Sequence, residues 1–132
     1  MGLKLKLISQ RFEMIELKRK DVIKEPSIEL ETRFDYRVKY TDDAKNCLAR
    51  LTCEIQAKDN PEVFSIKVIN IGEFEGEGMD ADEGKKEAHV ECNKILFPYT
   101  QYLVADLAVR AGFPPIYLEN RVPTIDQVIV EE

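Results

Sequence analysis

The single histidine of the chain, His89, lies three residues before a cysteine, Cys92. On a helix this spacing places both side chains on one face, where they could bind the same metal ion. A structural zinc site needs four ligands, and the sequence contains no CxxC pair and no second histidine. A cysteine nucleophile would need a base and an orienting third group, and nothing nearby indicates an oxyanion hole. We therefore expect two ordinary helix residues, with no metal site and no catalytic residue.

Three glycines, spaced G-x-x-x-G-x-G, lie in the acidic stretch Gly72–Gly78. The spacing matches neither a dinucleotide-binding loop nor a Walker loop, and the glutamates between the glycines would repel phosphate. The acidic cluster Glu73–Asp82 also lacks the ligand pattern of a calcium-binding loop. We interpret the stretch as a flexible, solvated connector, and we expect a protein that uses no cofactor and is not an enzyme.

Composition narrows the class of protein further. Charged residues make up 33% of the 132 residues, but the net charge is only −6 because both signs are interspersed. A nucleic-acid-binding protein would carry a basic stripe or patch, so no nucleic-acid partner is expected. The length and the 44% hydrophobic content suit one globular domain, which we assign to residues 1–132.

Cysteine usage and the N-terminal sequence favour a cytoplasmic location. The three cysteines are an odd number without the close spacing of a disulfide framework, which is typical of reduced thiols. Residues 1–7 alternate leucine with lysine and lack the apolar core of a signal peptide. No apolar stretch is long enough to span a bilayer, so no membrane insertion is expected.

The first two thirds of the chain have the period of β-strands. Leucine alternates with lysine over residues 3–7, whereas Phe12 and Met14 lie on the opposite parity. One strand that keeps one face buried needs an extra residue between these runs, so we predict a bulge at Ser9–Arg11.

Three further strands follow with short polar turns between them. Residues 28–40 place apolar side chains and one threonine at even positions and charged ones at odd positions, and residues 47–57 are apolar at odd positions. The next run, Val63–Ile71, is more continuously apolar, which predicts cover on both faces for part of its length. The polar turns indicate antiparallel hairpins, so these three strands should form a meander.

Two helices are expected after the connector. Asp80 or Asp82 is a candidate cap for a first helix that runs to about Asn93. A second helix should begin at Pro98 and end before Gly112, because a proline pair follows. This second helix is apolar most of the way round, which favours burial against the sheet on one side and a second subunit on the other. Residues 123–132 fit either a short amphipathic helix or a strand.

A resemblance to a known family rests on residues 95–118. They include ILFPY at 95–99, the pair Asp106-Leu107, and RAGFPPIYL at 110–118. These stretches resemble the SecB family of export chaperones, whose long helix starts with ILFPYxRE and is followed by RGxFPxLxL. Val63–Val68 together with Phe74 is similar to the family's fourth strand. The resemblance covers nearly the whole chain and is most specific over 95–118.

The resemblance implies an α+β fold, in which a four-stranded antiparallel sheet has helices packed on one face. It also implies a homotetramer built as a dimer of dimers, with the long helices between the sheets. The oligomer interface carried over to this sequence consists of Leu3, Leu5, Tyr99, Tyr102, Leu103, Asp106, Leu107 and Arg110.

The implied function is that of an ATP-independent holdase, which binds unfolded polypeptides such as preproteins for export in apolar surface grooves. The client-binding groove carried over consists of Val22, Ile23, Ile28, Leu30, Phe113, Ile116, Tyr117, Leu118, Val122, Ile125, Val128 and Ile129.

Partners beyond the clients are the motor ATPase SecA or an antitoxin. Phe64, Ser65 and Lys67 are the candidate contact with a motor or another partner, although the family has an acidic residue and a leucine where this chain has Lys67 and Ser65. Two alternatives stay open, namely a SecB-like chaperone dedicated to an antitoxin and a non-chaperone structural or adaptor domain with the same fold.

Overall fold

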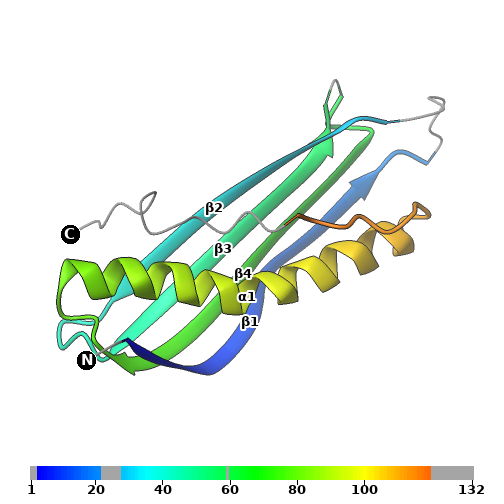
Figure 1. The fold of residues 1–132 in the computed structure, drawn as a ribbon. Coiled ribbons are helices and arrows are strands. Elements are labelled where there is room, and N and C mark those ends of the chain that lie inside the picture. The colour runs from blue at the N-terminus through cyan, green and yellow to red at the C-terminus, as the bar shows by residue number, and fades with distance from the viewer. Residues whose placement is uncertain (1–2, 22–27, 59, 120–132) are drawn as a thin grey trace.

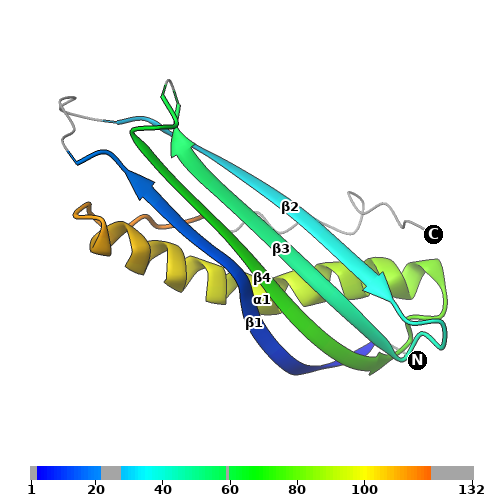
Figure 2. The ribbon, with the colours of Figure 1, turned by 180° about the vertical axis from the view of Figure 1, so that it is seen from behind.

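A four-stranded antiparallel sheet and one long helix make up the computed structural model, which describes residues 3–21, 28–58 and 60–119. The elements in chain order are β1 (Lys4–Arg19), β2 (Leu30–Tyr40), β3 (Asn46–Ala57), β4 (Phe64–Glu77) and α1 (Asp82–Arg110). The strand order in the sheet is β1-β4-β3-β2. The helix lies across one face of the sheet (Figure 1), and the view from behind shows the other face with no helix over it (Figure 2). The expected α+β fold is confirmed, with one helix on the covered face.

The predicted meander of β2, β3 and β4 is confirmed by the register of the three strands. The turn from β2 to β3 is stabilised by its own polar side chains. The Asp43 carboxylate accepts hydrogen bonds from the Thr41 hydroxyl at 2.6 Å and from the Lys45 backbone N–H at 3.1 Å. These bonds lower the pKa of the Asp43 carboxyl below its ordinary value. Such local bonds explain why a short polar link is enough to reverse the chain.

The β1 strand has two irregularities, where the sequence predicted one bulge at Ser9–Arg11. The register with β4 shifts between Leu7 and Ser9 and again between Phe12 and Met14. Phe12 pairs with the buried Asn70, but Met14 pairs with Ile69 on the opposite face and is exposed. The second shift was missed because Met14 is apolar, and its parity was therefore assigned to the core.

The β4 strand continues to Glu77, so the prediction of a flexible connector from Gly72 was wrong. The strand alternation persists through this stretch, because Phe74 is buried toward the helix while Glu73 and Glu75 are exposed on the other face. Cover on both faces is confirmed at Ile71, which is buried although it lies on the face without the helix. The acidic residues led to the prediction of a connector, but they belong to the solvent-exposed face of an ordinary strand.

One continuous helix replaces the two that were predicted, and Pro98 lies inside it. Proline cannot donate a backbone hydrogen bond and usually breaks or kinks a helix. The helix continues because buried side chains hold both sides of the proline, Leu96 and Phe97 before it and Thr100 after it. In Figure 1 the ribbon changes direction near the middle of α1. The predicted aspartate cap is also wrong, because the N-cap residue is Ala81 and no side-chain hydrogen bond caps it.

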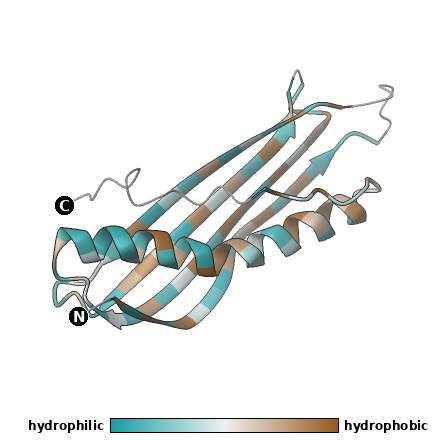
Figure 3. Cartoon of the chain, viewed as in Figure 1, coloured by the Kyte–Doolittle hydropathy of each residue, from teal (hydrophilic) through white to brown (hydrophobic). Residues whose placement is uncertain are grey.

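The core between sheet and helix consists of two clusters. One joins the end of β3 and the start of β4 to the last turns of α1, around Ile55, Ile66 and Val104. The other joins the start of β3 and the end of β4 to the first half of α1, around Leu51, Phe74 and Leu96. Figure 3 shows the alternation of hydrophobic and hydrophilic residues along the strands that produces this one-sided core.

The first turn of α1 lies directly on the turn that follows β4, and Gly84 makes this approach possible. A Cβ atom at Gly84 would overlap the carbonyl oxygen of Gly78. We predict that Gly84→Ala lowers the free energy of unfolding by about 1–3 kcal/mol, because the backbone must shift. Helix propensity alone predicts the opposite sign.

Urea unfolding followed by circular dichroism measures this change. The control is Lys94→Ala, an exposed position of the same helix, which should stay within about 0.5 kcal/mol of the unmodified protein. Equal or greater stability of Gly84→Ala would contradict the packing of the helix start on Gly78.

Candidate functional site

The chain leaves α1 through a sharp turn at Gly112, which has a φ of 89°. This left-handed conformation is one that glycine adopts without strain. The backbone N–H groups of Gly112 and Phe113 donate to the carbonyl oxygens of Val109 and Ala108, so the last carbonyls of the helix are satisfied. The turn directs residues 113–119 back along the face of the sheet that carries the helix (Figure 1).

Arg19, at the end of β1, fixes the start of this returning segment. Its Nη1 atom donates a hydrogen bond to the carbonyl oxygen of Ala111 at 2.6 Å. Its guanidinium also lies 5.1 Å from the centre of the Phe113 ring, within the range of a cation–π contact. The same ring meets Phe64 edge-to-face at 5.0 Å between centroids. The role of Arg19 was not predictable from the sequence, because it depends on a contact between residues 92 positions apart.

The returning segment alternates between buried and exposed side chains. Ile116 and Leu118 are partly buried and pack against the core, whereas Tyr117 between them is 82% exposed. The Gln101 side chain, on α1, donates a hydrogen bond to the carbonyl oxygen of Leu118 at 2.9 Å. The segment is therefore an extended strip that is pinned at both ends and presents apolar side chains only half covered.

The first residue of β2 and the segment just before that strand carry the other part of this surface. Ile28 is partly buried against the same core cluster, and Leu30 is exposed at the start of β2. We call these partly buried and exposed residues together the apolar strip, which consists of Ile28, Leu30, Phe113, Ile116, Tyr117 and Leu118. Val22, Ile23, Val122, Ile125, Val128 and Ile129, which were also predicted for the groove, lie outside the described residues.

The outer surface of α1 carries half of the side chains predicted for a subunit interface. Tyr99 and Tyr102 are exposed, the latter by 80%, and Asp106 forms an exposed ion pair with Arg110 at 2.8 Å. Val109 is also exposed there and was missed by the sequence prediction. We call these five residues the helix ridge.

The other four residues assigned to the interface differ in position. Leu107 is buried in the core, so its assignment to an exposed contact was wrong. Apolar residues surround the helix almost completely over residues 103–111, and the sequence alone could not separate its two sides there. Leu3 and Leu5 are partly buried against the first half of α1, and Leu103 is partly buried against the core near its end.

The three residues predicted to contact a motor or another partner, Phe64, Ser65 and Lys67, do not all lie on the same face of the sheet. Phe64 is buried in the core, so its assignment to a partner contact was wrong. Ser65 and Lys67 lie on the face without the helix, where the Lys67 ammonium is 3.3 Å from the Glu54 carboxylate. Successive side chains of a strand point to opposite faces of the sheet, so Phe64 faces the helix while Ser65 faces the other side.

The polar groups of the described residues form no evident reaction centre. Burial lowers the pKa of His89, and Cys92 lies against Cys47 instead of a base. No group of three or more histidine, cysteine, aspartate or glutamate side chains gathers at a metal-binding distance in the part of the chain that the structure describes. A search over the same residues finds no helix long and apolar enough to cross a membrane.

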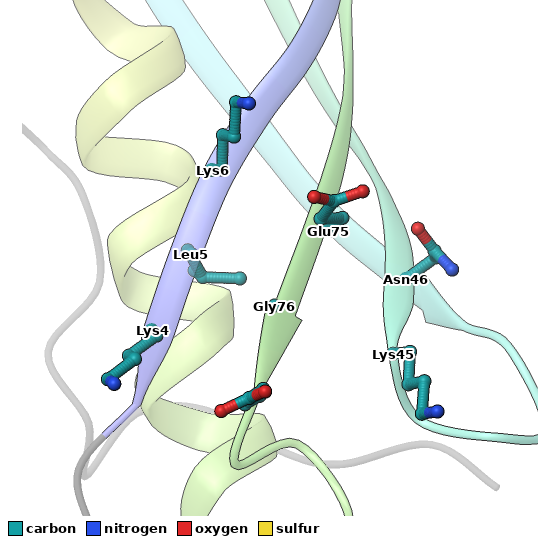
Figure 4. Close-up of a pocket in the computed structure, with 8 residues that line it drawn as sticks. Lys4, Leu5, Lys6, Lys45, Asn46, Glu75 and Gly76 are labelled. Atoms are coloured by element: carbon teal, nitrogen blue, oxygen red, sulfur yellow. The ribbon is translucent and has the colours of Figure 1, made fainter.

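A charged recess of about 470 Å³ lies at the opposite end of the sheet from the returning segment. Figure 4 shows lysine and glutamate side chains from β1, β4 and the turn before β3 around Gly76. Gly76 in its lining allows β1 to approach closely, because a Cβ atom there would overlap the carbonyl oxygen of Lys4. Its mixed charges and mainly open walls distinguish it from the apolar strip.

We predict that Arg19→Ala loosens the start of the returning segment. The hydrogen bond to Ala111 and the contact with Phe113 are both lost, so the free energy of unfolding should fall by about 1 kcal/mol. Hydrogen exchange of the Gly112 and Phe113 amides should become faster. Arg37→Ala is the control, because Arg37 forms its ion pair with Asp35 on an exposed face. Unchanged exchange at both amides in Arg19→Ala would contradict the anchoring role.

The chain is similar to proteins of a known family. The model of the SecB family, described as preprotein translocase subunit SecB, matches residues 11–122. Among curated relatives, the protein-export protein SecB of a Ruegeria species is 27% identical over 97 residues. That alignment covers 73% of this chain and 59% of the relative, so the chain spans about three fifths of that protein. The protein-export protein SecB of Albidiferax ferrireducens is 32% identical over 71 residues, which cover 53% of this chain and 46% of the relative.

Solved structures agree on the fold. A SecB-like chaperone of Mycobacterium tuberculosis, solved in complex with a peptide from an antitoxin, superimposes with a TM-score of 0.69 at 18% identity. The match covers 91% of this chain and 88% of the other. A Streptococcus agalactiae protein of unknown function superimposes with a TM-score of 0.53 at 12% identity, over 91% of this chain and all of the other. Together with the family match over most of its length, these findings show that the chain belongs to the SecB family.

Proposed function

We propose that this protein is an ATP-independent holdase, a chaperone that binds unfolded polypeptides on the apolar strip and catalyses no reaction. The observation that carries the proposal is the strip itself, in which Tyr117 is 82% exposed beside the half-covered Ile116 and Leu118. Membership of the SecB family and the likeness to a SecB-like chaperone support the same function. We place the protein in the cytoplasm as a single domain.

The chemistry of the strip suits clients without a fixed sequence. Apolar area removed from water contributes roughly 25 cal/mol per Å², whatever the identity of the side chain. An unfolded chain offers such area along its whole length. Aromatic residues such as Phe113 and Tyr117 supply large contact areas with few rotatable bonds. Several weak contacts along one client then add up without any sequence-specific site.

The proposed assembly is a homotetramer in which the helix ridge meets a second subunit. Tyr102 is a large side chain exposed on a helix, and exposed aromatic residues are common at protein interfaces. The adjacent Asp106–Arg110 pair would supply the polar rim of such a contact. Joining subunits would also extend the client surface, because each subunit contributes one apolar strip.

The partners that deliver or receive clients belong to the same proposal. The face with Ser65 and Lys67 is our candidate surface for a motor such as SecA. An antitoxin is the alternative client, since the similar Mycobacterium tuberculosis chaperone was solved with an antitoxin peptide. A structural or adaptor domain without chaperone activity is the remaining alternative.

Two exposed tyrosines allow the client surface and the subunit interface to be tested separately. Tyr117→Ser should weaken the suppression of aggregation of a denatured client several-fold, because it removes apolar area from the strip without disturbing the core. Tyr102→Ser should instead lower the molecular mass in solution and leave client binding per subunit nearly unchanged. The two side chains are matched, with 82% and 80% exposure. Light scattering measures both the aggregation and the mass.

Tyr117 is a better test position than Ile116 or Leu118. Those two side chains pack against the core, so replacing either with aspartate would also disturb the fold. No suppression of aggregation by the unmodified protein at one tetramer per client would contradict the holdase proposal. Full suppression of aggregation by Tyr117→Ser would show that clients bind elsewhere than on the apolar strip. An unchanged mass for Tyr102→Ser would exclude the helix ridge as the subunit contact.

A further inference from the structure

Two cysteine thiols meet in the buried layer between the sheet and the helix. The Sγ atoms of Cys47, near the start of β3, and Cys92, in the first half of α1, are 3.7 Å apart. Cys47 is 4% exposed and Cys92 is fully buried. The residues are 45 positions apart in the sequence, so the fold alone brings the two thiols together.

We propose that Cys47 and Cys92 form a peroxide-sensitive thiol pair, which is reduced at rest and closes to a disulfide when the protein meets hydrogen peroxide. A disulfide bond is about 2.05 Å long, so the two sulfur atoms need to approach by roughly 1.7 Å. Cysteine side chains have one rotatable bond each before the sulfur, and a change in these torsions supplies much of the movement. The third cysteine, Cys53, belongs to the other core cluster.

The environment assigns different roles to the two thiols. The hydrogen bond from Cys92 favours the thiolate of Cys47 and lowers its pKa. The same bond and burial raise the pKa of Cys92. Cys47 also keeps a small exposed fraction, whereas Cys92 has none, so peroxide reaches Cys47 first. We therefore assign Cys47 as the nucleophile, which reacts as the thiolate, and Cys92 as the resolving thiol.

The reaction balances with hydrogen peroxide as the only oxidant. The Cys47 thiolate attacks one peroxide oxygen, the O–O bond breaks, and the products are a sulfenic acid and hydroxide, which takes the proton of Cys47 to become water. The Cys92 sulfur then attacks the sulfenic sulfur. The S–S bond forms, the S–O bond breaks, and the hydroxyl leaves as water with the proton of Cys92. Two thiols are oxidised and one peroxide is reduced to two water molecules.

The new bond would join the first half of α1 to the sheet near an existing polar contact. The Tyr40 hydroxyl, at the end of β2, donates to the carbonyl oxygen of Lys85 at 2.6 Å. A disulfide here closes a long loop and restricts the unfolded chain, which raises the melting temperature. The apolar strip follows the other end of α1, so the bond would stabilise the scaffold without covering the client surface.

The experiment treats the full-length, reduced protein with hydrogen peroxide, stops the reaction with catalase, and alkylates the remaining thiols after unfolding. Peptide mass analysis should find a Cys47–Cys92 disulfide, with Cys53 alkylated. Cys53 is the internal control, because it is fully buried on the same strand and burial raises its pKa to about 12. The melting temperature of the oxidised protein should rise by several degrees and return after treatment with dithiothreitol.

Cys92→Ser gives a second readout that does not depend on the disulfide. This variant should stop at the Cys47 sulfenic acid, which dimedone labels, whereas the unmodified protein should show little label. The proposal is overturned by three alkylated thiols after a peroxide dose that oxidises free glutathione. Oxidation of Cys53 to the same extent, or disulfides only between separate molecules, would overturn it as well. The assay uses no client, so it is independent of the holdase proposal.

Discussion

A buried hydrogen-bond network centred on Asn70 holds the sheet and the helix in register. The Asn70 amide accepts from Gln10 on β1 at 2.7 Å and donates to the Leu96 carbonyl at 2.9 Å and to the Thr100 hydroxyl at 3.2 Å. These two helix residues flank Pro98, where the helix lacks a backbone donor. A fully buried amide is costly unless it is bonded, so the network favours one placement of the helix over neighbouring ones. Both core clusters extend from this point in opposite directions.

The one-sided architecture explains why half-covered apolar surface exists at all. A single helix cannot cover four strands, and the ends of the sheet extend beyond it (Figure 1). The returning segment covers part of what remains, with Arg19 and Gln101 fixing its backbone at 2.6 Å and 2.9 Å. Polar anchors therefore hold an apolar segment in place, and its side chains need not be fully buried to be ordered. Such an arrangement suits a surface that exchanges apolar partners.

The sequence predicted the parts of the fold that depend on local periodicity. The β2–β4 meander follows from strict alternation, and the apolar character of the segment around Tyr117 was visible from its composition. Helix continuity through Pro98 was not predictable, because it depends on packing and on the Asn70 network. Leu107 and Phe64 were predicted to lie in contact surfaces, but both are buried in the core. Which side of an apolar helix or strand faces the core depends on the elements that pack against it, and the local sequence does not show this. The thiol pair and the Arg19 anchor join residues 45 and 92 positions apart, which no local pattern reveals.

The two irregularities of β1 have a consequence for its free edge. An outermost strand exposes a row of backbone donors and acceptors that a further strand can join. Each bulge interrupts the regular spacing of that row and increases the local twist. The row in β1 is therefore divided into short uniform stretches on either side of Ile8 and Glu13. A strand added along this edge can form backbone hydrogen bonds with only one short stretch at a time. This disfavours the long, uninterrupted strand pairing that leads to fibrils.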